Sequence, residues 1–427
     1  MHAFDLFGRR PFPQARQVRE KPKQVVAPRW LGHPHQCING CVKTVPPCAP
    51  VARERFGIII EAVKQIVWVM VVVSLVGLAP RPSAAARGTL DIYFIDVEGG
   101  QSTLVVTPAG QSFLVDTGFP GDGTFASLPG DPRKARDANR ILTAARAAGV
   151  KQIDYLLTTH FHADHDGGVV ELAQLIPIRT FVDHEPPGPH AERVAGTLAA
   201  FDRYARVRAT GKHLVPKPGS RIPLKGVEAL VVSSAGATLP KPLAGAGEAN
   251  PACGATGTDA QEPTENPRST GIRLRFGRFT FLDVGDLSGP PLFALVCPNS
   301  LVGPTDVYLV AHHGGVDAAD PATFAGLAPR VAIVNNGATK GGAPELLAAL
   351  HQARGLEDAW QLHRSEASGP KNVPDDRIAN LDESTAHWIA VRAKEDGSFT
   401  VTNGRTGVTK SYRARAGTSR PIPTRVP

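Results

Sequence analysis

The sequence predicts an α+β fold in which two β-sheets pack face to face and helices cover the outer faces. Short β-branched and apolar segments alternate with glycine turns from residue 90 onward, which is typical of strands. Segments with helical spacing of apolar residues separate some of these strands, and no fixed-period repeat is present. With 42% hydrophobic residues, the chain of 427 residues can bury a large core. We therefore predict one folded domain over residues 89–415 and a tail over 416–427.

Each half of this domain is predicted to combine strands with helices. In the first half, strands are expected at 90–97, 103–107, 112–116, 153–158 and 178–182, and helices at 132–148, 169–175 and 191–207. In the second half, strands are expected at 226–232, 271–276, 279–284, 306–311 and 331–335, and helices at 321–326 and 343–353.

Histidine and aspartate are concentrated in the loop that joins the strand at 153–158 to the next helix. The run His160-Phe161-His162-Ala163-Asp164-His165 places three imidazoles and one carboxylate within six positions, and Gly167-Gly168 follows it closely. Imidazole nitrogen and carboxylate oxygen suit zinc or a similar divalent ion. A histidine cluster without metal is the alternative, and the interleaved aspartate disfavours it. The loop is therefore predicted to be a metal site.

This motif resembles the signature of the metallo-β-lactamase fold. Other segments of the chain resemble the remaining motifs of that fold, and they occur in the same order along the sequence. Asp116, in Phe113-Leu114-Val115-Asp116-Thr117-Gly118, resembles the early aspartate at a strand end. Asp286 resembles the carboxylate shared by two metals, and His312 or His313 resembles the late histidine. The resemblance spans about residues 89–412 and implies an αββα sandwich.

Within that fold, the segment Ile95-Asp96-Val97-Glu98-Gly99-Gly100-Gln101 is similar to the metallo-hydrolase domain of ComEC-like competence proteins. Two differences from that group are visible. Gln101 and Ser102 stand near the place of its second acidic residue, and the multi-helix membrane channel of those proteins is not found in this sequence.

The resemblance implies two metal ions, expected to be zinc, with iron or manganese as the other candidates. One ion is expected to be held by His160, His162 and a third histidine. His184 is preferred over His190 and His213 because it ends an apolar run. The second ion is expected to be held by Asp164, His165 and a late histidine, with Asp286 shared between the ions. His312 is preferred over His313 because it comes first after the strand.

The same resemblance implies a hydrolase that uses a metal-bridging hydroxide. Asp164 is expected to hold or accept the proton, and Asp116 to fix a ligand imidazole. Asn336 and Lys340 follow a predicted strand and are candidates for stabilising an oxyanion, although turn residues have the same composition. The resemblance also implies that histidine at 162 favours hydrolysis, because the di-iron oxygen or nitric oxide reductases of this superfamily have glutamate at the corresponding position. Mononuclear iron thiol dioxygenases keep the histidine and remain an alternative.

The expected substrate follows from two opposing observations. The ComEC-like segment favours a short phosphodiester, whereas the charge distribution favours a small ester, lactone or β-lactam. Residues 1–88 hold 13 Lys/Arg and 4 Asp/Glu, whereas the remainder holds 34 and 35, so the folded part gives no strong signal for binding nucleic acid. A metal-stabilised binding protein without catalysis is a further alternative.

The N-terminal part is expected to direct export. An apolar run over 66–79 is followed by small residues that resemble a signal-peptidase site, so residues 63–88 are predicted to be a signal peptide or membrane anchor. Residues 1–62 are predicted to be a disordered or mis-annotated extension. We expect a periplasmic or secreted protein that touches a membrane only through an uncleaved N-terminal segment.

Two further features lie in the second half of the domain. Cys253 and Cys297 are the cysteines of the predicted mature chain, and an oxidising compartment would allow a disulfide between them, with two free thiols as the alternative. Residues 239–269, rich in Gly, Pro, Ala and Glu, interrupt the second half. A loop of this length is expected either to overhang the metal site or to be a surface excursion.

Overall fold

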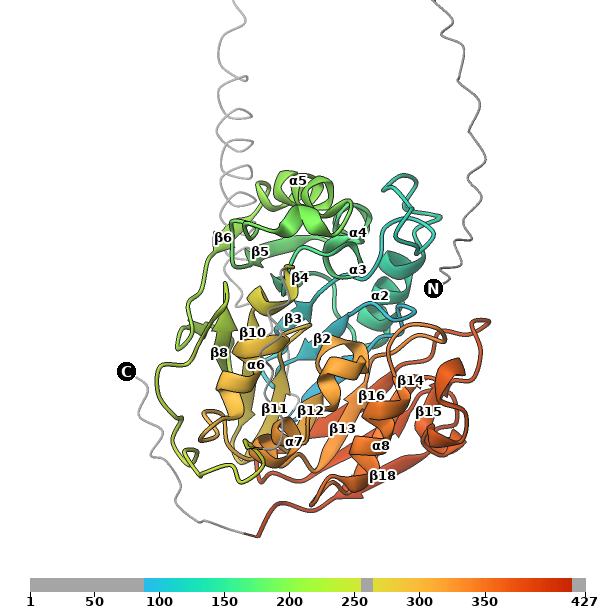
Figure 1. Cartoon of the computed structure of the whole chain (residues 1–427). Helices are drawn as coiled ribbons and strands as arrows, with labels where there is room; N and C mark the ends of the chain where they lie inside the picture. Colours follow the sequence, from blue (N-terminus) through green and yellow to red (C-terminus); the bar gives the residue numbers. More distant parts are fainter. Residues whose placement is uncertain (1–87, 255–263, 417–427) are drawn as a thin grey trace, which may run out of the picture. The chain divides into compact units, whose positions relative to one another are not determined.

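The computed structural model describes residues 88–254 and 264–416, which form two nine-stranded sheets (Figure 1). The first sheet has the order β18-β17-β16-β1-β2-β3-β4-β5-β6, and the second has the order β15-β14-β13-β12-β11-β10-β8-β7, with β9 paired to β8. The predictions for residues 1–62, for 63–88 and for the tail fall on 1–87 and 417–427, which lie outside the described residues.

The strands of the first sheet are β1 (Leu90–Phe94), β2 (Thr103–Val106), β3 (Ser112–Val115), β4 (Ile153–Leu157), β5 (Ile178–Val182), β6 (Lys212–Leu214), β16 (Ile389–Ala393), β17 (Phe399–Asn403) and β18 (Thr409–Tyr412). Those of the second sheet are β7 (Arg221–Ile222), β8 (Glu228–Ser234), β9 (Ala237–Thr238), β10 (Gly271–Phe276), β11 (Phe279–Asp283), β12 (Val307–Leu309), β13 (Val331–Val334), β14 (Asp358–His363) and β15 (Ile378–Asn380). The α-helices of the described residues are α2 (Arg136–Ala147), α3 (Ala163–Asp166), α4 (Val169–Leu175), α5 (Thr197–Arg208), α6 (Gly289–Val296), α7 (Pro321–Leu327) and α8 (Pro344–Gln352).

Three apolar cores establish the layer order. One core lies between the sheets and contains inward residues of both, such as Phe94 and Phe281, whose rings are 5.7 Å apart. A second core joins the outer face of the first sheet to α2, α4 and α5. The third joins the outer face of the second sheet to α6, α7 and α8, which Figure 1 shows over that sheet. The predicted αββα sandwich is therefore confirmed.

Parallel pairing brings several strand ends to one edge of each sheet. β3, β4, β5 and β6 are mutually parallel, as are β11, β12, β13, β14 and β15. Loops at the carboxyl ends of such strands are where α/β sheets bind ligands. Asp116, His160, Asp286 and His313 all come from loops of this kind, after β3, β4, β11 and β12.

Each predicted strand and helix is present, in most cases with shifted boundaries, but several elements of the structure were not predicted. The helix expected at 191–207 is divided into a 3₁₀ turn, Ala191–Arg193, and α5, because Gly196 adopts a left-handed φ of 89°. The strands β6, β7, β9 and β14 to β18 and the helices α3 and α6 were not predicted. Among residues 88–254 and 264–416, no helix has the length and apolar character needed to cross a membrane.

The two described parts of the long interruption at 239–269 have different surroundings. Its first part lies against the segment after α6, where Leu243 N donates to Leu301 O at 2.9 Å and Gly247 N donates to Ser300 O at 2.8 Å. Of the two alternatives for the cysteines, the disulfide is present and joins Cys253 to Cys297. Its last part, residues 264–269, reaches the histidine motif, as described below.

Candidate metal centre

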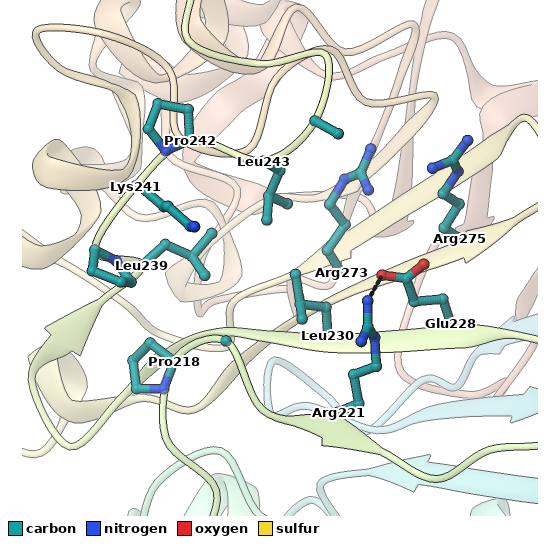
Figure 2. A pocket seen from close by; sticks show the side chains of 13 residues that line it. Pro218, Arg221, Glu228, Leu230, Leu239, Lys241, Pro242, Leu243, Arg273 and Arg275 are labelled. Carbon is teal, nitrogen blue, oxygen red and sulfur yellow. Dashed lines mark hydrogen bonds and ion pairs between the residues drawn. The ribbon is translucent and has the colours of Figure 1, made fainter. Parts of the chain in front are cut away.

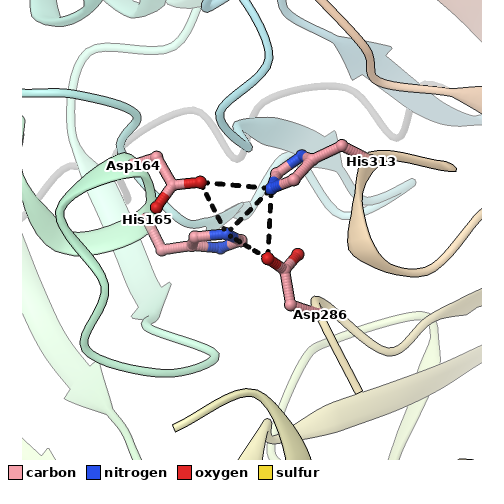
Figure 3. Close-up of side chains that lie close together, drawn as sticks. All are labelled: Asp164, His165, Asp286 and His313. Atoms are coloured by element: carbon pink, nitrogen blue, oxygen red, sulfur yellow. Dashed lines mark hydrogen bonds and ion pairs between the residues drawn. The ribbon is translucent and has the colours of Figure 1, made fainter. Parts of the chain in front are cut away.

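Four buried side chains converge where the loops after β4, β11 and β12 meet. They are Asp164, His165, Asp286 and His313, and one ligand atom from each lies within 4.8 Å of the others (Figure 3). Nε2 of His313 is 3.2 Å from Oδ2 of Asp164 and 3.1 Å from Oδ2 of Asp286. Nε2 of His165 is 3.2 Å from both Asp286 Oδ2 and His313 Nε2. Each residue is at most 4% exposed, so this arrangement has the donors and the shielding that a divalent ion requires.

His160 and His162 form an adjoining pair. Nε2 of His160 lies 3.0 Å from Nδ1 of His162 and 3.9 Å from Oδ2 of Asp286. Nδ1 of His160 faces the hydroxyls of Thr159 and Ser269 at 3.1 and 3.4 Å. The carboxylate of Asp286 therefore lies between the His160 imidazole on one side and the imidazoles of His165 and His313 on the other.

The consecutive histidines after β12 have different surroundings. Both adopt left-handed backbone conformations, with φ of 50° for His312 and 52° for His313. The tight turn directs His313 into the four-residue group, whereas His312 remains 30% exposed in its side chain. Its Nε2 lies 3.8 Å from Asp286 Oδ2 and 3.2 Å from Asn266 Nδ2, and its Nδ1 lies 2.8 Å from Asp317.

This turn explains a difference from the sequence-based expectation. His312 was preferred over His313 as the ligand beside Asp164 and His165, on the assumption that the first residue after the strand points to the site. The structure instead places His313 there and His312 beside Asp286. A left-handed turn of two non-glycine residues is uncommon, and the sequence gives no strong signal for it.

His184 lies apart from these two groups. It is 1% exposed, its ring packs against Phe161 with centroids 4.7 Å apart, and its Nε2 is 3.3 Å from Oε2 of Glu265. The other candidates are not brought to the centre either. His213 pairs with Asp183 at 2.9 Å, and His190 is exposed at the start of a 3₁₀ turn. The three ligand-like groups among the described residues do not include His184.

Glu265 is a buried acid that the sequence-based reasoning did not identify. It is 0% exposed, and Gly188 N donates to its Oε1. Burial alone would raise the pKa of Glu265, but His184, Gly188 and Arg268 together lower it. Its charge also opposes the lowering of the His162 pKa that burial causes. Its position shortly before β10, in a loop with few apolar residues, was the feature of the sequence that could have identified it.

Asp116 contacts the imidazole of His165 at Nδ1, the ring nitrogen that faces away from the centre. Its Oδ2 lies 2.7 Å from Nδ1 of His165, and its carboxylate accepts hydrogen bonds from the backbone N and the hydroxyl of Thr159 at 2.8 and 2.7 Å. A carboxylate at Nδ1 fixes the tautomer that leaves Nε2 facing the centre. Gly168 permits the close backbone approach here, since a Cβ atom would lie 2.2 Å from the carbonyl oxygen of Thr117.

The buried histidines and aspartates of the centre shift one another's pKa values. Burial lowers the pKa of His165, but Asp286, Asp164 and Asp116 outweigh this effect and raise it well above its usual value. Burial raises the pKa of Asp164, but Lys340 and His165 outweigh it and lower the pKa well below its usual value. Burial also lowers the pKa of His160 well below its usual value. The low pKa values of Asp164 and His160 favour an ionised carboxylate and a neutral imidazole, which are the forms that bind a metal ion.

The two predicted oxyanion candidates have different positions. Lys340 Nζ contacts the carboxylate of Asp164 and donates to Gly99 O at 2.6 Å, so it lies at the centre. The amide of Asn336 donates to the carbonyls of Gly337 and His363, both at 2.9 Å, and so supports its own loop. The structure therefore brings Lys340, and not the Asn336 amide, to the charged groups.

Gln101 has a structural role that sequence alone did not indicate. It is 1% exposed, and its amide donates to Asp283 Oδ1 at 3.0 Å, while Asn335 donates to its Oε1 at 3.3 Å. Burial, opposed by hydrogen bonds from Gly285 and Gln101, raises the pKa of Asp283 to about 7. An acidic side chain at 101 would face this buried carboxyl, so glutamine fits the position.

The sequence profile described as "Metallo-beta-lactamase superfamily" matches residues 95–321. The chain belongs to the metallo-β-lactamase superfamily. The matched segment includes every residue of the four-residue group as well as His160, His162 and Asp116. The superfamily assignment therefore agrees with the fold and with the composition of the centre.

Individual relatives are distant or local. An atrochrysone carboxyl ACP thioesterase of Passalora fulva is 38% identical over 78 residues, which are 18% of this chain and 19% of that protein. The chain thus matches about a fifth of the length of this curated relative. The metallo-β-lactamase fold protein YhfI of Bacillus subtilis is 10% identical, with coverage of 64% and 95% and a TM-score of 0.39. CmlA, a diiron β-hydroxylase of Streptomyces venezuelae, is 14% identical, with coverage of 66% and 53% and a TM-score of 0.36.

Proposed function

We propose that the protein is a metal-dependent hydrolase whose catalytic centre is the group of histidines and aspartates around Asp286. One observation carries this proposal: Oδ2 of Asp286 lies within 3.2 Å of the Nε2 atoms of His165 and His313. A second pair of imidazoles, those of His160 and His312, has its Nε2 atoms 3.9 and 3.8 Å from the same oxygen. A carboxylate surrounded in this way is suited to bridge two cations.

The side chains present fit divalent ions. Oδ1 of Asp286 and Nε2 of His162 are buried, and neither has a hydrogen-bond partner among the described residues. Buried polar atoms normally have a partner, so atoms of this kind mark where a ligand is expected. The donors are imidazole nitrogen and carboxylate oxygen without thiolate, which suits zinc, with iron and manganese as alternatives.

We assign one ion to Asp164, His165, His313 and Asp286, and a second to His160, His162 and Asp286. His312 is the preferred additional ligand of the second ion, because its Nε2 lies 3.8 Å from the shared carboxylate. His184 is the alternative, and its Nε2 is 3.3 Å from Glu265. In this assignment, the charge of Glu265, which is paired with His184, acts on His162.

When bound, the two divalent ions would acidify water and polarise the oxygen of a scissile carbonyl or phosphoryl group. The side chains around them have separate tasks. Asp116 keeps His165 in the tautomer that presents Nε2. Asp164 holds or accepts the proton of the attacking water. Lys340, beside Asp164, is placed to stabilise negative charge on the substrate in the transition state.

The preferred substrate class is a phosphodiester. A phosphodiester carries the negative charge that Lys340 can neutralise, and the segment from Ile95 to Gln101 is similar to ComEC-like metallo-hydrolase domains. The second candidate is an acyl ester, thioester or lactone, favoured by the local match to the Passalora fulva thioesterase. The balance of 34 basic and 35 acidic residues after residue 88 supports a small substrate over a long nucleic acid.

We further propose that the protein is exported. The bond between Cys253 and Cys297 supports this, because disulfides persist in oxidising compartments. The apolar segment within residues 63–88 is the proposed signal peptide or anchor.

A substrate screen of the metal-loaded full chain tests the function. Bis-p-nitrophenyl phosphate, an acyl thioester, a lactone and a chromogenic cephalosporin are assayed with wild type and with Asp286→Asn. Turnover of bis-p-nitrophenyl phosphate that the variant lacks supports the phosphodiesterase, and turnover confined to the thioester or lactone supports the second candidate. Thiol-dependent oxygen uptake by the iron-loaded protein would instead establish a dioxygenase, and no turnover with intact metal would support a binding protein.

A further inference from the structure

A pocket of about 300 Å³ lies on the outer face of the second sheet (Figure 2). β8 and β10 form its floor, and the segment after β9, residues 239–244, forms its opposite wall. Inward residues of β10 such as Ile272 and Leu274 belong to the core between the sheets, so Arg273 and Arg275 point to the outer face. None of the residues around Asp286 lines this pocket.

The charge of the pocket is strongly unbalanced. Its lining contains Arg221, Arg273, Arg275 and Lys241 but a single acid, Glu228. Arg221 is paired with Glu228 at 3.3 Å. The three remaining cations have no ion pair among the described residues, and Figure 2 shows Arg273 and Arg275 side by side on β10.

Arg273 is the most unusual of these cations. No hydrogen bond or ion pair between described residues involves its guanidinium, and its Nε is buried without a partner. Burial, and then the charge of Arg275, lower the pKa of Arg273, while the charges of Glu228 and Asp306 oppose this lowering. Arg273 as a whole is partly exposed, but its buried Nε without an acceptor is unfavourable, and an anion in the pocket would compensate it.

The opposite wall is apolar. Leu239, which is 5% exposed, and Leu243 belong to this wall, and Leu230 of β8, which is 8% exposed, adds an aliphatic side chain to the floor. The segment that carries Leu239 and Leu243 is held in place by the hydrogen bond from Leu243 N to Leu301 O. The pocket therefore combines cationic groups with aliphatic groups in a volume that suits a small molecule.

We propose that this pocket binds a small organic anion, with a phosphate, phosphonate or carboxylate head on Arg273 and Arg275 and a short apolar group against the leucines. Paired guanidiniums donate to such heads through several N–H groups. Lys241 lies on the opposite wall and supplies a further positive charge. The site is separate from the proposed hydrolytic centre and does not depend on the hydrolase proposal.

Calorimetric titration of the metal-loaded full chain with phenylphosphonate tests this site, because a phosphonate resists hydrolysis. Benzoate tests the carboxylate head, and benzyl alcohol is the neutral control. Since the metal centre can also bind a phosphonate, we expect two binding events in wild type. Asp286→Asn should remove one event and leave the other.

Arg273→Gln and Arg275→Gln should each weaken the remaining event by about tenfold or more. Glu228→Gln removes the competing carboxylate and should strengthen it a few-fold, an effect that misfolding cannot imitate. Arg392→Gln, at an exposed arginine paired with Asp91 on the first sheet, is the matched control and should leave binding unchanged. Equal binding by wild type, the two arginine variants and Glu228→Gln, or equal binding of benzyl alcohol, would overturn the proposal.

Discussion

Oδ2 of Asp116 lies 2.7 Å from Nδ1 of His165, and both side chains are fully buried. Asp116 follows β3 and His165 lies in α3, so the contact joins two separate loops at one edge of the first sheet. The imidazole is thereby held between Asp116 on one nitrogen and Asp286 on the other, which is 3.2 Å away. This geometry gives His165 a fixed tautomer before any ion binds.

The first prediction concerns this contact. Asp116→Asn removes the negative charge but keeps the size of the side chain, so His165 should lose its preferred tautomer. We expect metal affinity to fall by about 10- to 100-fold. Competition with a chromogenic chelator measures the affinity. Asp122→Asn, at an exposed aspartate outside the centre, is the control. Unchanged affinity in the Asp116 variant would show that this contact does not support the metal.

The second prediction separates the neighbouring histidines. His313→Ala should remove the ion that is also held by Asp164 and His165, whereas His312→Ala should weaken the ion held by His160 and His162. Elemental analysis after dialysis should therefore find about one ion per chain in His313→Ala. His184→Ala is the critical comparison. It should retain two ions, and loss of one ion in His184→Ala but not in His312→Ala would make His184 the ligand.

The third prediction concerns Lys340, whose Nζ contacts a carboxylate that is also a proposed metal ligand. Lys340→Gln removes a cation that competes with metal for Asp164, so metal affinity should rise. The same change removes charge stabilisation in the transition state, so kcat should fall by about 100-fold. Opposite changes in these two quantities, measured on one preparation, would support the assignment. A parallel loss of both would instead indicate a general disturbance of the centre.

The fourth prediction concerns stability and pH. Burial lowers the pKa of His363, but hydrogen bonds and charges of Asp96 and Glu98, at 3.0 and 3.1 Å, outweigh it and raise the pKa to about 9. A raised pKa stabilises the folded state fully below the unfolded value of about 6.5, and this contribution is lost as pH rises through 9.

The expected loss in the free energy of unfolding is about 3 kcal/mol between pH 6.5 and 9.5. Urea unfolding across this range measures it. His363→Gln is the comparison, and its stability should depend less on pH over the same interval. If wild type and variant show the same pH dependence, the ion pairs of His363 do not contribute.

The fifth prediction concerns the disulfide between Cys253 and Cys297, which are 44 residues apart in sequence. Replacing both cysteines by alanine should lower the free energy of unfolding by about 2 to 4 kcal/mol, because the unfolded chain gains conformational freedom. Chemical unfolding under oxidising conditions measures the change. Reducing agent should destabilise wild type but not the double variant; equal sensitivity of both proteins would contradict a structural role.

Residues 153–165 show why much of the fold and centre could be predicted from sequence. An apolar strand followed by interleaved histidine and aspartate combines two local patterns, and both are visible without the fold. Asp286 was predictable for the same reason, since it follows an apolar strand through Gly285. These patterns involve residues that are close together along the chain, so they can be read from the sequence without knowledge of the fold.

The positions of His313, Glu265 and Gln101 could not be predicted in this way. His313 depends on two left-handed residues in succession, and Glu265 on how an irregular loop returns to β10. Gln101 contacts Asp283, 182 positions away, across the two sheets. The later strands β14 to β18 are short and partly polar, so their burial comes from tertiary packing and not from local periodicity.

The number of metal ions bound by wild type and by Asp286→Asn tests the central claim most directly. Elemental analysis of the full chain should find two ions per wild-type molecule and at most one in the variant, with hydrolytic activity lost at the same time. Two ions and full turnover in Asp286→Asn would contradict a centre in which this carboxylate serves both groups of histidines.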